Sequence, residues 1–386
     1  MFHRGTCRFR VTTVSVFIAL GLAAAGCIPK SPPATAAESL PQVDGRDPAN
    51  VGRGDRVRTD GARLFETETF GGNGRTCSTC HRAEDSFSTT PASAQQRFAA
   101  DPTDPLFRSF DSDDGAGHQY TRLLAHATIR VEIPLTCPNL WLEDDPTAKS
   151  VVLNRGIPEL LNTPALDRAL MSDGRLPNLE QQALAAIHDH VDPTLEPAAD
   201  DLQRLAQHEV TDAFFSSEAL RRFAKGGPAP ELPPGNTPEE MRGRRHFLPD
   251  RLCGTCHSGP MLNTTSEASV LGPGQRFNNT RTGELVPEQI INPFLRWHVI
   301  QRDGTHRVFQ AFADPGRMLI TCQRDDLTKF KIRSLWNVKN TAPYFHDHSA
   351  KTLEDVIAHY RQFFILRKLP ASDQDLADIL AYLRLL

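Results

Sequence analysis

The chain has 386 residues, of which 39% are hydrophobic and 23% charged, and its formal net charge at pH 7 is −4. This composition excludes a disordered, collagen-like or coiled-coil chain, and the length allows two or three domains. The small negative charge gives no electrostatic reason to expect a nucleic acid or an anionic membrane surface as a partner. Eight cysteines are too few for a disulfide-dense scaffold, so the role of each depends on its surroundings.

The first 26 residues have the pattern of an export signal. Three arginines precede a 15-residue apolar run, Val11 to Ala25, which Gly26 and Cys27 follow. The run is shorter than the roughly 20 residues that a membrane-spanning helix needs. We therefore predict that residues 1–26 are a signal peptide and that the mature protein resides in the periplasm or cell envelope.

Two interpretations of the cleavage region stay open. The segment Leu22 to Cys27 resembles a bacterial lipobox, in which Cys27 would become the lipidated first residue of a lipoprotein. An ordinary cut at the small residues Ala34 to Ala37 is the alternative. Residues 27–58 are mostly polar and contain several prolines, so we predict a tether there, with membrane contact only through a lipid anchor.

Two pentapeptides, Cys77 to His81 and Cys253 to His257, share the pattern CxxCH. Two thiols on one turn can add to the two vinyl groups of one porphyrin, and the adjacent histidine presents an imidazole to the iron. We therefore predict two covalently bound haem c groups. Structural zinc would need cysteine pairs about 15 to 20 residues apart, and a thioredoxin-like site would need one CxxC near a βαβ pattern. The predicted haem-binding residues are Cys77, Cys80, His81, Cys253, Cys256 and His257, with His81 and His257 as iron ligands.

The surroundings of the two motifs repeat along the chain. Gly61 to Phe65 precedes the first motif as Gly243 to Phe247 precedes the second. Further matches follow downstream at a nearly constant offset of 174 to 176 residues, which indicates a duplication. The matched pairs are Leu161-Asn162 with Trp336-Asn337, Asp173 with Asp347, Leu179-Glu180 with Leu353-Glu354, and Asp201-Leu202 with Asp375-Leu376.

Each half is predicted to contain a short helix, the CxxCH motif, a loop-rich stretch and two more helices. Thr352 opens a helix with Tyr360 on its apolar face, and Ser372 can cap the last helix. No strongly alternating series of strands is expected, so the predicted fold class is mainly α. Residues 226–238, rich in glycine and proline, are predicted to be an interdomain linker that ends in a helix start at Thr237.

Together with the two CxxCH units, the segments Phe330 to Asn337 and Thr341 to Asp347 resemble the bacterial di-haem cytochrome c peroxidases and MauG-type enzymes. The similarity covers roughly residues 59–386. It implies two tandem cytochrome c-like helical domains, each with one covalent haem. Residues 59–225 would hold the peroxidatic haem and residues 239–386 the electron-transfer haem. The resemblance also implies hydrogen peroxide as substrate and a small redox protein as electron donor.

The duplicated halves differ at the position of Tyr360, which is Ala186 in the first half. A buried phenol oxygen needs a partner, whereas alanine has no polar group to satisfy. The resemblance aligns Tyr360 with the distal ligand of the second haem, where an anionic oxygen would favour ferric iron. The alternative is that Tyr360 is a plain core residue and that Met318 or His359 is the ligand.

The first haem is expected to be five-coordinate and open. No histidine lies between Ala127 and Ile187, the stretch where peroxidases of this family place a histidine that seals the first haem. His118 and His126 lie upstream and are the remaining candidates for a sixth ligand.

A carboxylate near an open iron can move protons between the peroxide oxygens. Counted from Asp173 without gaps, the resemblance places the family's distal Glu on Asp192 and its nearby Gln on Gln182. His188 and His190 are further candidates for an acid–base group or an iron ligand, although a polar helix end would have the same pattern. The predicted catalytic residues are Asp192, Gln182 and His190.

Several positions depart from the family pattern. Ser172 replaces the tryptophan that lies between the haems, so the aromatic bridge is missing. Near the second haem, Trp336 and Arg333 replace an arginine and a proline. Trp141, Trp297 and Trp336 are candidates for another electron relay, with plain packing as the alternative.

Calcium is left open as a cofactor. The family's calcium uses an Asn side chain and two backbone carbonyls. Thr341 and Pro343 keep the carbonyl positions, but Gly156 stands at the Asn position and has no side-chain oxygen.

The two cysteines that are still unassigned are Cys137 and Cys322. In an oxidising compartment we expect them to pair and to close a long loop across the two domains. Two separate buried thiols are the alternative.

The leading interpretation is an exported di-haem peroxidase that reduces hydrogen peroxide at an open first haem, with electrons relayed through the second haem. One alternative is a MauG-type oxidase that acts on a protein or an organic molecule, and another is a non-catalytic electron carrier. A high-spin ferric signal that disappears with peroxide would indicate an enzyme, and two unreactive low-spin haems would indicate a carrier.

Overall fold

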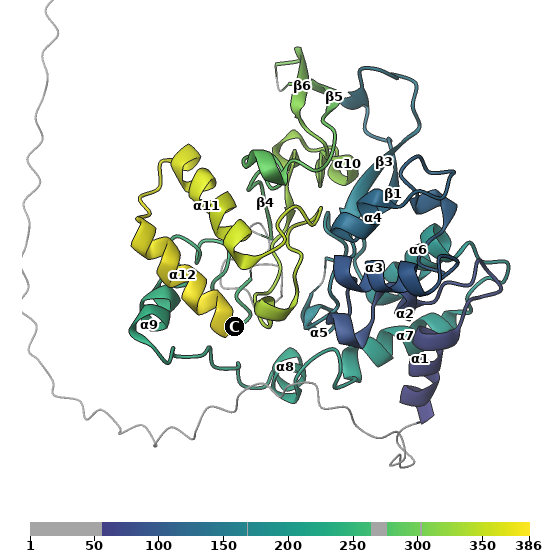
Figure 1. Cartoon of the computed structure of the whole chain (residues 1–386), viewed down its shortest axis with the longest axis horizontal. Helices are drawn as coiled ribbons and strands as arrows, with labels where there is room; N and C mark the ends of the chain where they lie inside the picture. The colour runs from purple at the N-terminus through teal and green to yellow at the C-terminus, as the bar shows by residue number, and fades with distance from the viewer. Residues whose placement is uncertain (1–55, 168, 264–275, 302) are drawn as a thin grey trace, which may run out of the picture. The chain divides into compact units, whose positions relative to one another are not determined.

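The structure, a computed structural model, describes residues 56–167, 169–263, 276–301 and 303–386 (Figure 1). These residues belong to one compact unit of the chain. The predicted signal peptide, the candidate lipid anchor at Cys27 and most of the predicted tether lie outside the described residues. Within the part that the structure describes, no helix is long and apolar enough to cross a membrane.

Helices make up most of the regular structure, as predicted (Figure 1). Those of the first half are α1 (Arg56–Thr67), α2 (Cys77–Cys80), α3 (Pro91–Ala100), α4 (Thr121–His126), α5 (Thr163–Leu166), α6 (Leu179–Val191), α7 (Ala199–Thr211) and α8 (Glu218–Ala224). Those of the second half are α9 (Pro238–Arg245), α10 (Met318–Thr321), α11 (Leu353–Arg367) and α12 (Asp373–Leu385). Short 3₁₀ turns cover Ala83–Asp85, Ser109–Asp111, Pro287–Gln289, Arg324–Asp326 and Val338–Asn340.

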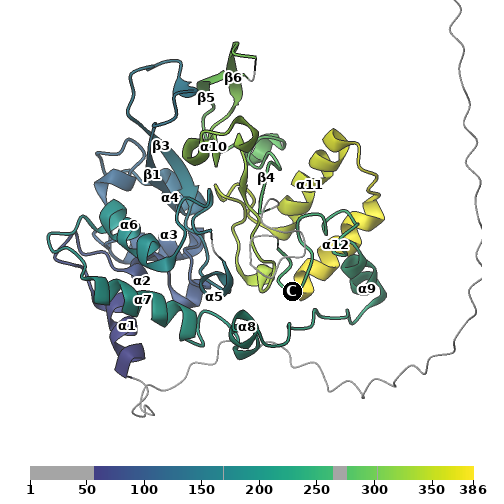
Figure 2. The same cartoon turned by 180° about the vertical axis from the view of Figure 1, so that it is seen from behind.

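The same helix crossing occurs in both halves, with α1 beside α7 and α9 beside α12 (Figures 1 and 2). At Gly61 of α1, a Cβ atom would lie 2.5 Å from the carbonyl oxygen of Arg204 on α7. At Gly243 of α9, a Cβ atom would lie 2.0 Å from the carbonyl oxygen of Asp378 on α12. Glycine therefore lets both helix pairs approach to backbone contact, since it has no Cβ. Arg204 and Asp378 are separated by the offset of the duplication, so the repeat in the sequence is also a repeat in the structure.

The predicted helix starts are confirmed by their caps. The Thr352 hydroxyl accepts a hydrogen bond from the third amide of α11, and the Ser372 hydroxyl accepts one from the third amide of α12 (both 3.1 Å). Thr237 caps α9 in the same manner. Each cap satisfies a backbone N–H that has no partner inside its helix.

The expectation that the chain lacks alternating strands was wrong. β1 (Thr128–Pro134) pairs antiparallel with β3 (Ser150–Gly156), between α4 and α5. Ile129, Val131 and Ile133 of β1 are buried, whereas the charged residues between them are more exposed, which is the period-two pattern of a half-buried strand. The other strands are β2 (Leu140–Leu142), β5 (Leu295–Ile300) and β6 (His306–Phe312) in one sheet, and β4 (Phe277–Asn278) with β7 (Phe330–Lys331) in another.

Two of the hydrophobic cores contain residues from both predicted halves. One packs β1 and β3 against Trp297 of β5 and Met318 of α10. The other packs Leu166 of α5 and Leu220 of α8 against Trp336. The predicted linker therefore separates the halves along the sequence without separating their cores, and the domain boundaries stay a prediction. Trp297 and Trp336 are both buried packing residues of these cores.

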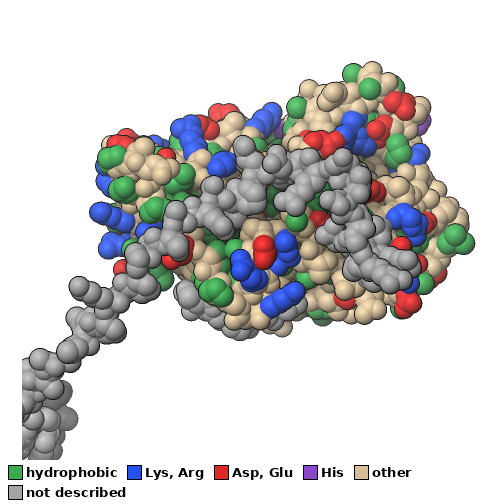
Figure 3. Space-filling view, turned by 90° about the horizontal axis from the view of Figure 1, so that it is seen from below, with side chains coloured by type: hydrophobic (Ala, Val, Ile, Leu, Met, Phe, Trp, Pro, Cys, Tyr) green, Lys and Arg blue, Asp and Glu red, His purple; other side chains and the backbone are tan. Residues whose placement is uncertain are grey.

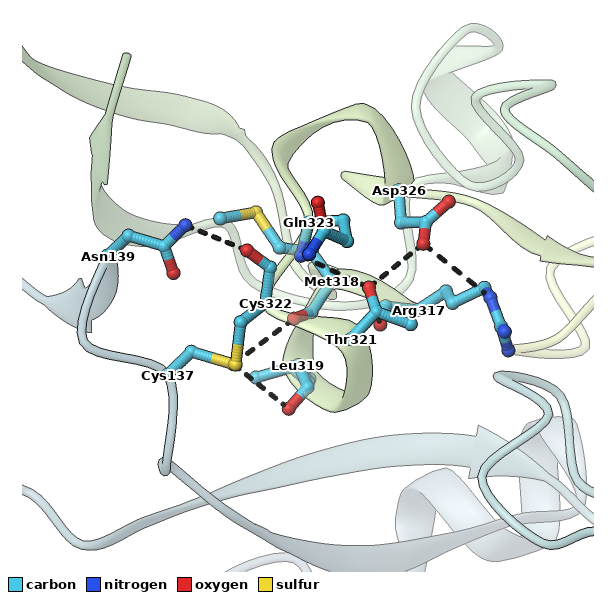
Figure 4. Close-up of a disulfide and its surroundings, with 9 residues drawn as sticks. All are labelled: Cys137, Asn139, Arg317, Met318, Leu319, Thr321, Cys322, Gln323 and Asp326. Atoms are coloured by element: carbon cyan, nitrogen blue, oxygen red, sulfur yellow. Dashed lines mark hydrogen bonds and ion pairs between the residues drawn. A yellow bond between two sulfur atoms is a disulfide. The ribbon is translucent and has the colours of Figure 1, made fainter. Parts of the chain in front are cut away.

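A disulfide joins Cys137 to Cys322, which confirms the predicted pairing. Figure 4 shows it at the end of α10, where the Cys137 sulfur lies 3.4 Å from the Met318 carbonyl oxygen. The Asn139 side-chain amide donates a hydrogen bond to the Cys322 carbonyl (2.8 Å). The bond links residues 185 positions apart and so connects the two predicted halves covalently.

The surface carries both signs of charge. On the face drawn in Figure 3, basic and acidic side chains are interspersed among the described residues, without a broad patch of one sign. Ion pairs such as Arg204–Asp200, Arg222–Glu218 and Arg384–Glu354 join exposed side chains, and such pairs contribute little to stability.

Candidate haem-binding and catalytic site

The first CxxCH motif forms the short helix α2. The Thr76 amide donates to the Thr79 hydroxyl (2.9 Å) at the start of this turn. The His81 amide donates to the Cys77 carbonyl (3.0 Å) at its end. The second motif has no assigned helix, but the amide of its histidine makes the equivalent bond to its first cysteine (2.7 Å). In both motifs the turn therefore gathers two thiols and one imidazole.

Each motif histidine is held at Nδ1 by a backbone carbonyl. His81 Nδ1 donates to the Phe87 carbonyl, and His257 Nδ1 donates to the Leu262 carbonyl (both 2.8 Å). With the proton on Nδ1, the lone pair of Nε2 is available to a metal. Burial lowers the pKa of both imidazoles, although their carbonyl partners oppose the shift, so both are neutral at neutral pH.

The four motif cysteines are unpaired, in contrast to Cys137 and Cys322. Burial raises the pKa of Cys77 and of Cys253 to about 12, so both are neutral thiols. Two free thiols and an imidazole with an available Nε2, repeated on two turns, form the donor set of two c-type haems. The residues present therefore fit this cofactor.

A buried ion pair holds the first motif in place. Arg75, just before α2, pairs with Asp111 at 2.5 Å, and the two side chains are only 3% and 0% exposed. Arg75 also donates to the carbonyls of Pro105 and Leu106 (2.9 and 2.8 Å). Asp111 accepts a hydrogen bond from the Arg130 amide of β1 (2.9 Å). This network ties the motif to β1.

Two of the predicted catalytic residues lie on α6. Gln182 and His190 are both partly buried, two helical turns apart. The Nδ1 atom of His190 is buried and has no hydrogen-bond partner. Burial lowers the pKa of His190 to about 4, and Arg75 and His81 add to the lowering while Asp111 opposes it. A neutral imidazole therefore lies close to the first CxxCH motif.

Asp192, the third predicted catalytic residue, has different surroundings. It is the C-cap of α6, in a left-handed conformation with φ of 52°, and its side chain is exposed. The helix ends there because the chain turns away before Pro193, and the turn directs Asp192 to the surface. That exposure counts against Asp192 as a proton carrier beside a buried iron. His188 is also exposed, and its Nε2 pairs with the Glu196 carboxylate (3.1 Å).

In the second half, Tyr360 of α11 faces the CxxCH motif. Burial raises the pKa of Tyr360, and the neighbouring Cys256 and Cys253 add to the shift. The ring packs edge-on against His359 and Phe345. Tyr360 therefore lies near the cysteines of the second motif, and its role as an iron ligand stays a prediction.

The alternative ligands of the second haem are engaged elsewhere. His359 is fully buried, and its Nε2 donates to the Thr280 carbonyl (3.0 Å). Met318 lies in the core beside the Cys137–Cys322 disulfide (Figure 4). Among the first-half candidates, His118 is exposed.

His126, the other upstream candidate, ends α4. Its pKa is lowered by burial and by Lys351, and Asp347 opposes the shift. Its carbonyl oxygen accepts a hydrogen bond from His348 Nδ1 (3.0 Å). His126 therefore belongs to the surroundings of residues 347–351 in the second half.

The calcium site that the resemblance implies does not fit these residues. A Cβ atom on Gly156 would lie 2.1 Å from Cδ2 of His348, so the imidazole of His348 fills the space beside Gly156. An asparagine side chain could not be accommodated there without displacing His348. The only donors that remain from the family site are the backbone carbonyls of Thr341 and Pro343, which are too few for a calcium ion.

Sequence reasoning missed a buried carboxyl on α7. Glu209 is 5% exposed, and its Oε2 has no hydrogen-bond partner. Its charge would raise the pKa of Cys77, so it lies near the first motif. The repeat in the sequence could have revealed this carboxyl. Glu209 occupies the position of Leu383, a buried residue of α12, so the repeat predicts that Glu209 is buried as well.

No protein-family model matches the chain. Cytochrome-c peroxidase IdrP1 of Denitromonas iodatirespirans is 29% identical over 160 residues, or 38% of this chain and 40% of that protein. Cytochrome-c peroxidase IdrP2 of the same organism is 23% identical over 337 residues, or 85% of this chain and 79% of that protein. The chain is therefore similar to proteins named as cytochrome-c peroxidases. A cytochrome c peroxidase is an oxidoreductase, and two further relatives, of a Pseudomonas strain and of Escherichia coli, carry the same name.

Among solved structures, a MauG-like protein associated with microbial copper homeostasis matches with a TM-score of 0.51 at 20% identity. The match covers 88% of this chain and 90% of the MauG-like protein. At this identity the match shows that the two proteins share a fold. The alignment with IdrP1 spans less than half of that relative, so the activity of this chain is argued from its own site below.

Proposed function

We propose that this protein is an exported di-haem peroxidase that reduces hydrogen peroxide to water at its first haem. Cys77, Cys80 and His81 would hold the first haem, and Cys253, Cys256 and His257 the second, each through two thioether bonds and one imidazole. The observation that carries the proposal is the difference between α6 and α11. α6 presents Ala186 and a neutral His190 near the first motif, whereas α11 presents Tyr360 near the second.

When bound, a haem iron supplies an oxygen-binding position and reversible one-electron chemistry. The reaction consumes one peroxide, two electrons and two protons and releases two waters. Because Ala186 offers no ligand, the first site would stay open to peroxide. Tyr360 would close the second site with its phenol oxygen, which suits a haem that only transfers electrons.

His190 is the group that we assign to proton transfer. Its unpartnered Nδ1 can accept a proton from one oxygen of hydrogen peroxide and deliver it to the other oxygen, which leaves as water. The lowered pKa of His190 keeps the imidazole unprotonated, as a base requires at neutral pH. Gln182, on the same helix, would orient the peroxide through its side-chain amide. A small redox protein would supply the electrons.

A comparison of His190→Gln with His188→Gln tests this assignment. Loss of a proton-transferring group costs on the order of 10² to 10⁴-fold in rate. We therefore expect His190→Gln to lose peroxide turnover by that factor with both haems still bound, while the exposed His188→Gln keeps the wild-type rate. Turnover of His190→Gln within about twofold of wild type, together with a large loss in Asp192→Asn, would reverse the assignment.

A MauG-type oxidase is the second candidate function, and Tyr360 near the second motif is the observation that favours it. Peroxide turnover with a small redox donor separates the two functions from each other. A peroxidase consumes the donor stoichiometrically with peroxide, whereas an oxidase of proteins modifies an added protein substrate in the absence of a donor. The Tyr360→Phe variant should lose a low-spin ferric signal under either function.

A further inference from the structure

The turn that contains His348 repeats a turn of the first half. The pair Asp347-His348 corresponds to Asp173-Gly174 at the constant offset of the duplication. Both positions after the aspartate have a left-handed backbone conformation, with φ of 69° at Gly174 and 58° at His348. Glycine adopts this conformation without strain, whereas a positive φ is uncommon for other residues. The second half therefore keeps the backbone of the turn but adds an imidazole where the first half has no side chain.

The imidazole of His348 reaches from the second half into the first. A Cβ atom on Gly156, the last residue of β3, would lie 2.1 Å from Cδ2 and 2.4 Å from Nε2 of His348. The ring fits there because glycine has no Cβ. The ring also donates a hydrogen bond from Nδ1 to the carbonyl oxygen of His126, the last residue of α4 (3.0 Å). His348 is 3% exposed, so its ring contacts the ends of two first-half elements away from water.

Backbone hydrogen bonds fix the turn on both sides of the ring. The Gly156 amide donates to the carbonyl oxygen of His346, two residues before His348 (2.8 Å). The Asp347 carboxylate accepts a hydrogen bond from the Ser349 amide (3.1 Å), which closes the turn around His348. His346, Asp347 and Ser349 are all less than a tenth exposed. The backbone therefore holds the imidazole against the ends of β3 and α4.

We propose that His348 replaces calcium as the group that joins the two halves at this place, so that the protein needs no divalent cation there. The resemblance implies a calcium ion held by Thr341 and Pro343 of the second half and by a first-half side chain at position 156. The ring occupies the space that such a side chain would need. It joins the halves instead through its contact with Gly156 and its hydrogen bond to the first half. A strained backbone persists where the surrounding contacts hold it in place, which accounts for the positive φ of His348.

Thermal denaturation of the full-chain holoprotein tests the proposal. We expect the melting temperature of the wild type to be the same in EDTA and in excess calcium chloride. His348→Gly should lower it by several degrees, because the variant loses a buried ring and a hydrogen bond between the halves. The matched control is Lys368→Gly, since Lys368 also has a positive φ (54°) but an exposed side chain. Glycine relieves the backbone at both positions, so a loss confined to His348→Gly comes from the contacts of the ring.

A double variant tests whether the ring stands in the place of the cation. Gly156→Asn combined with His348→Gly removes the ring and supplies a side-chain oxygen to accompany the carbonyls of Thr341 and Pro343. We expect calcium to raise the melting temperature of this variant, and magnesium to do so far less, because calcium accepts irregular sets of oxygen ligands. The wild type should respond to neither ion.

Three results would each overturn the proposal. They are a wild-type melting temperature that falls in EDTA or rises with calcium, a His348→Gly variant as stable as Lys368→Gly, and a double variant that calcium does not stabilise. If His348→Gly does not fold, the response of the wild type to EDTA and calcium decides the result. These measurements do not use turnover, so the proposed peroxidase function fails separately, if cation-insensitive holoprotein does not reduce peroxide.

Discussion

The buried carboxyl of Glu209 makes a quantitative prediction about stability. Burial raises its pKa to about 8, from the usual value of 4.5 in an exposed glutamate. Between these two pH values the folded protein keeps a proton that the unfolded chain releases. The stabilising effect of that proton is complete below pH 4.5 and is lost as the pH rises to about 8. Glu209→Gln removes this titration, because an amide has no proton to release.

The magnitude follows from the width of the window. One pKa unit corresponds to about 1.4 kcal/mol, so the full shift of Glu209 amounts to about 5 kcal/mol between the two pH limits. This figure is an upper limit, because a buried carboxyl lowers its cost by local relaxation or by admitting water. We therefore expect the stability of the wild type, measured against Glu209→Gln, to fall by about 3 to 5 kcal/mol from acid to mildly basic pH.

Urea denaturation of the holoprotein at several pH values from about 5 to about 8 measures this difference. All other titrating groups are common to both proteins, so the difference between the two curves isolates Glu209. Glu66→Gln is the control, because Glu66 is exposed on α1 and should give a curve parallel to that of the wild type. Parallel curves for Glu209→Gln and wild type would refute the argument.

Two further predictions concern the framework. Replacing both Cys137 and Cys322 with alanine should lower the free energy of unfolding by up to about 5 kcal/mol, because the bond closes a loop of 185 residues; an unchanged denaturation midpoint would contradict this. Gly243→Ala should cost about 1 to 3 kcal/mol, because the new methyl group would press on the Asp378 carbonyl. Gly61→Ala, at the equivalent crossing, should cost a similar amount, and thermal denaturation that is insensitive to both changes would contradict the repeated crossing.

Local patterns in the sequence were sufficient where one short segment determines the structure. The CxxCH motifs, the caps at Thr352 and Ser372 and the repeated Gly61 and Gly243 positions all depend on neighbours within a few residues or on the constant offset of the duplication. Helix caps and motif turns form from local hydrogen bonds, so they can be predicted without knowledge of the rest of the fold.

The strands within the stretches predicted to be loop-rich were not predicted from the sequence. β1 has the alternating pattern of a strand, but its partner β3 lies across an intervening loop and β2 pairs with β5 of the other half. Strand pairing between distant segments leaves little local signal. Local sequence also does not show which of Asp192 and His190, two residues apart, is exposed. The end of α6 turns Asp192 to the surface and leaves His190 partly buried.

The sequence by itself determined that the chain has two CxxCH turns in a duplicated, mainly helical framework, because these features are written in adjacent residues and in a constant spacing. Only the tertiary structure decided which polar side chains meet. It placed His190 near the first motif, filled the space beside Gly156 with His348, and paired Glu159 with Arg333 across the two halves. Such contacts depend on how distant segments pack, and burial then changes the charge state of the groups that they bring together.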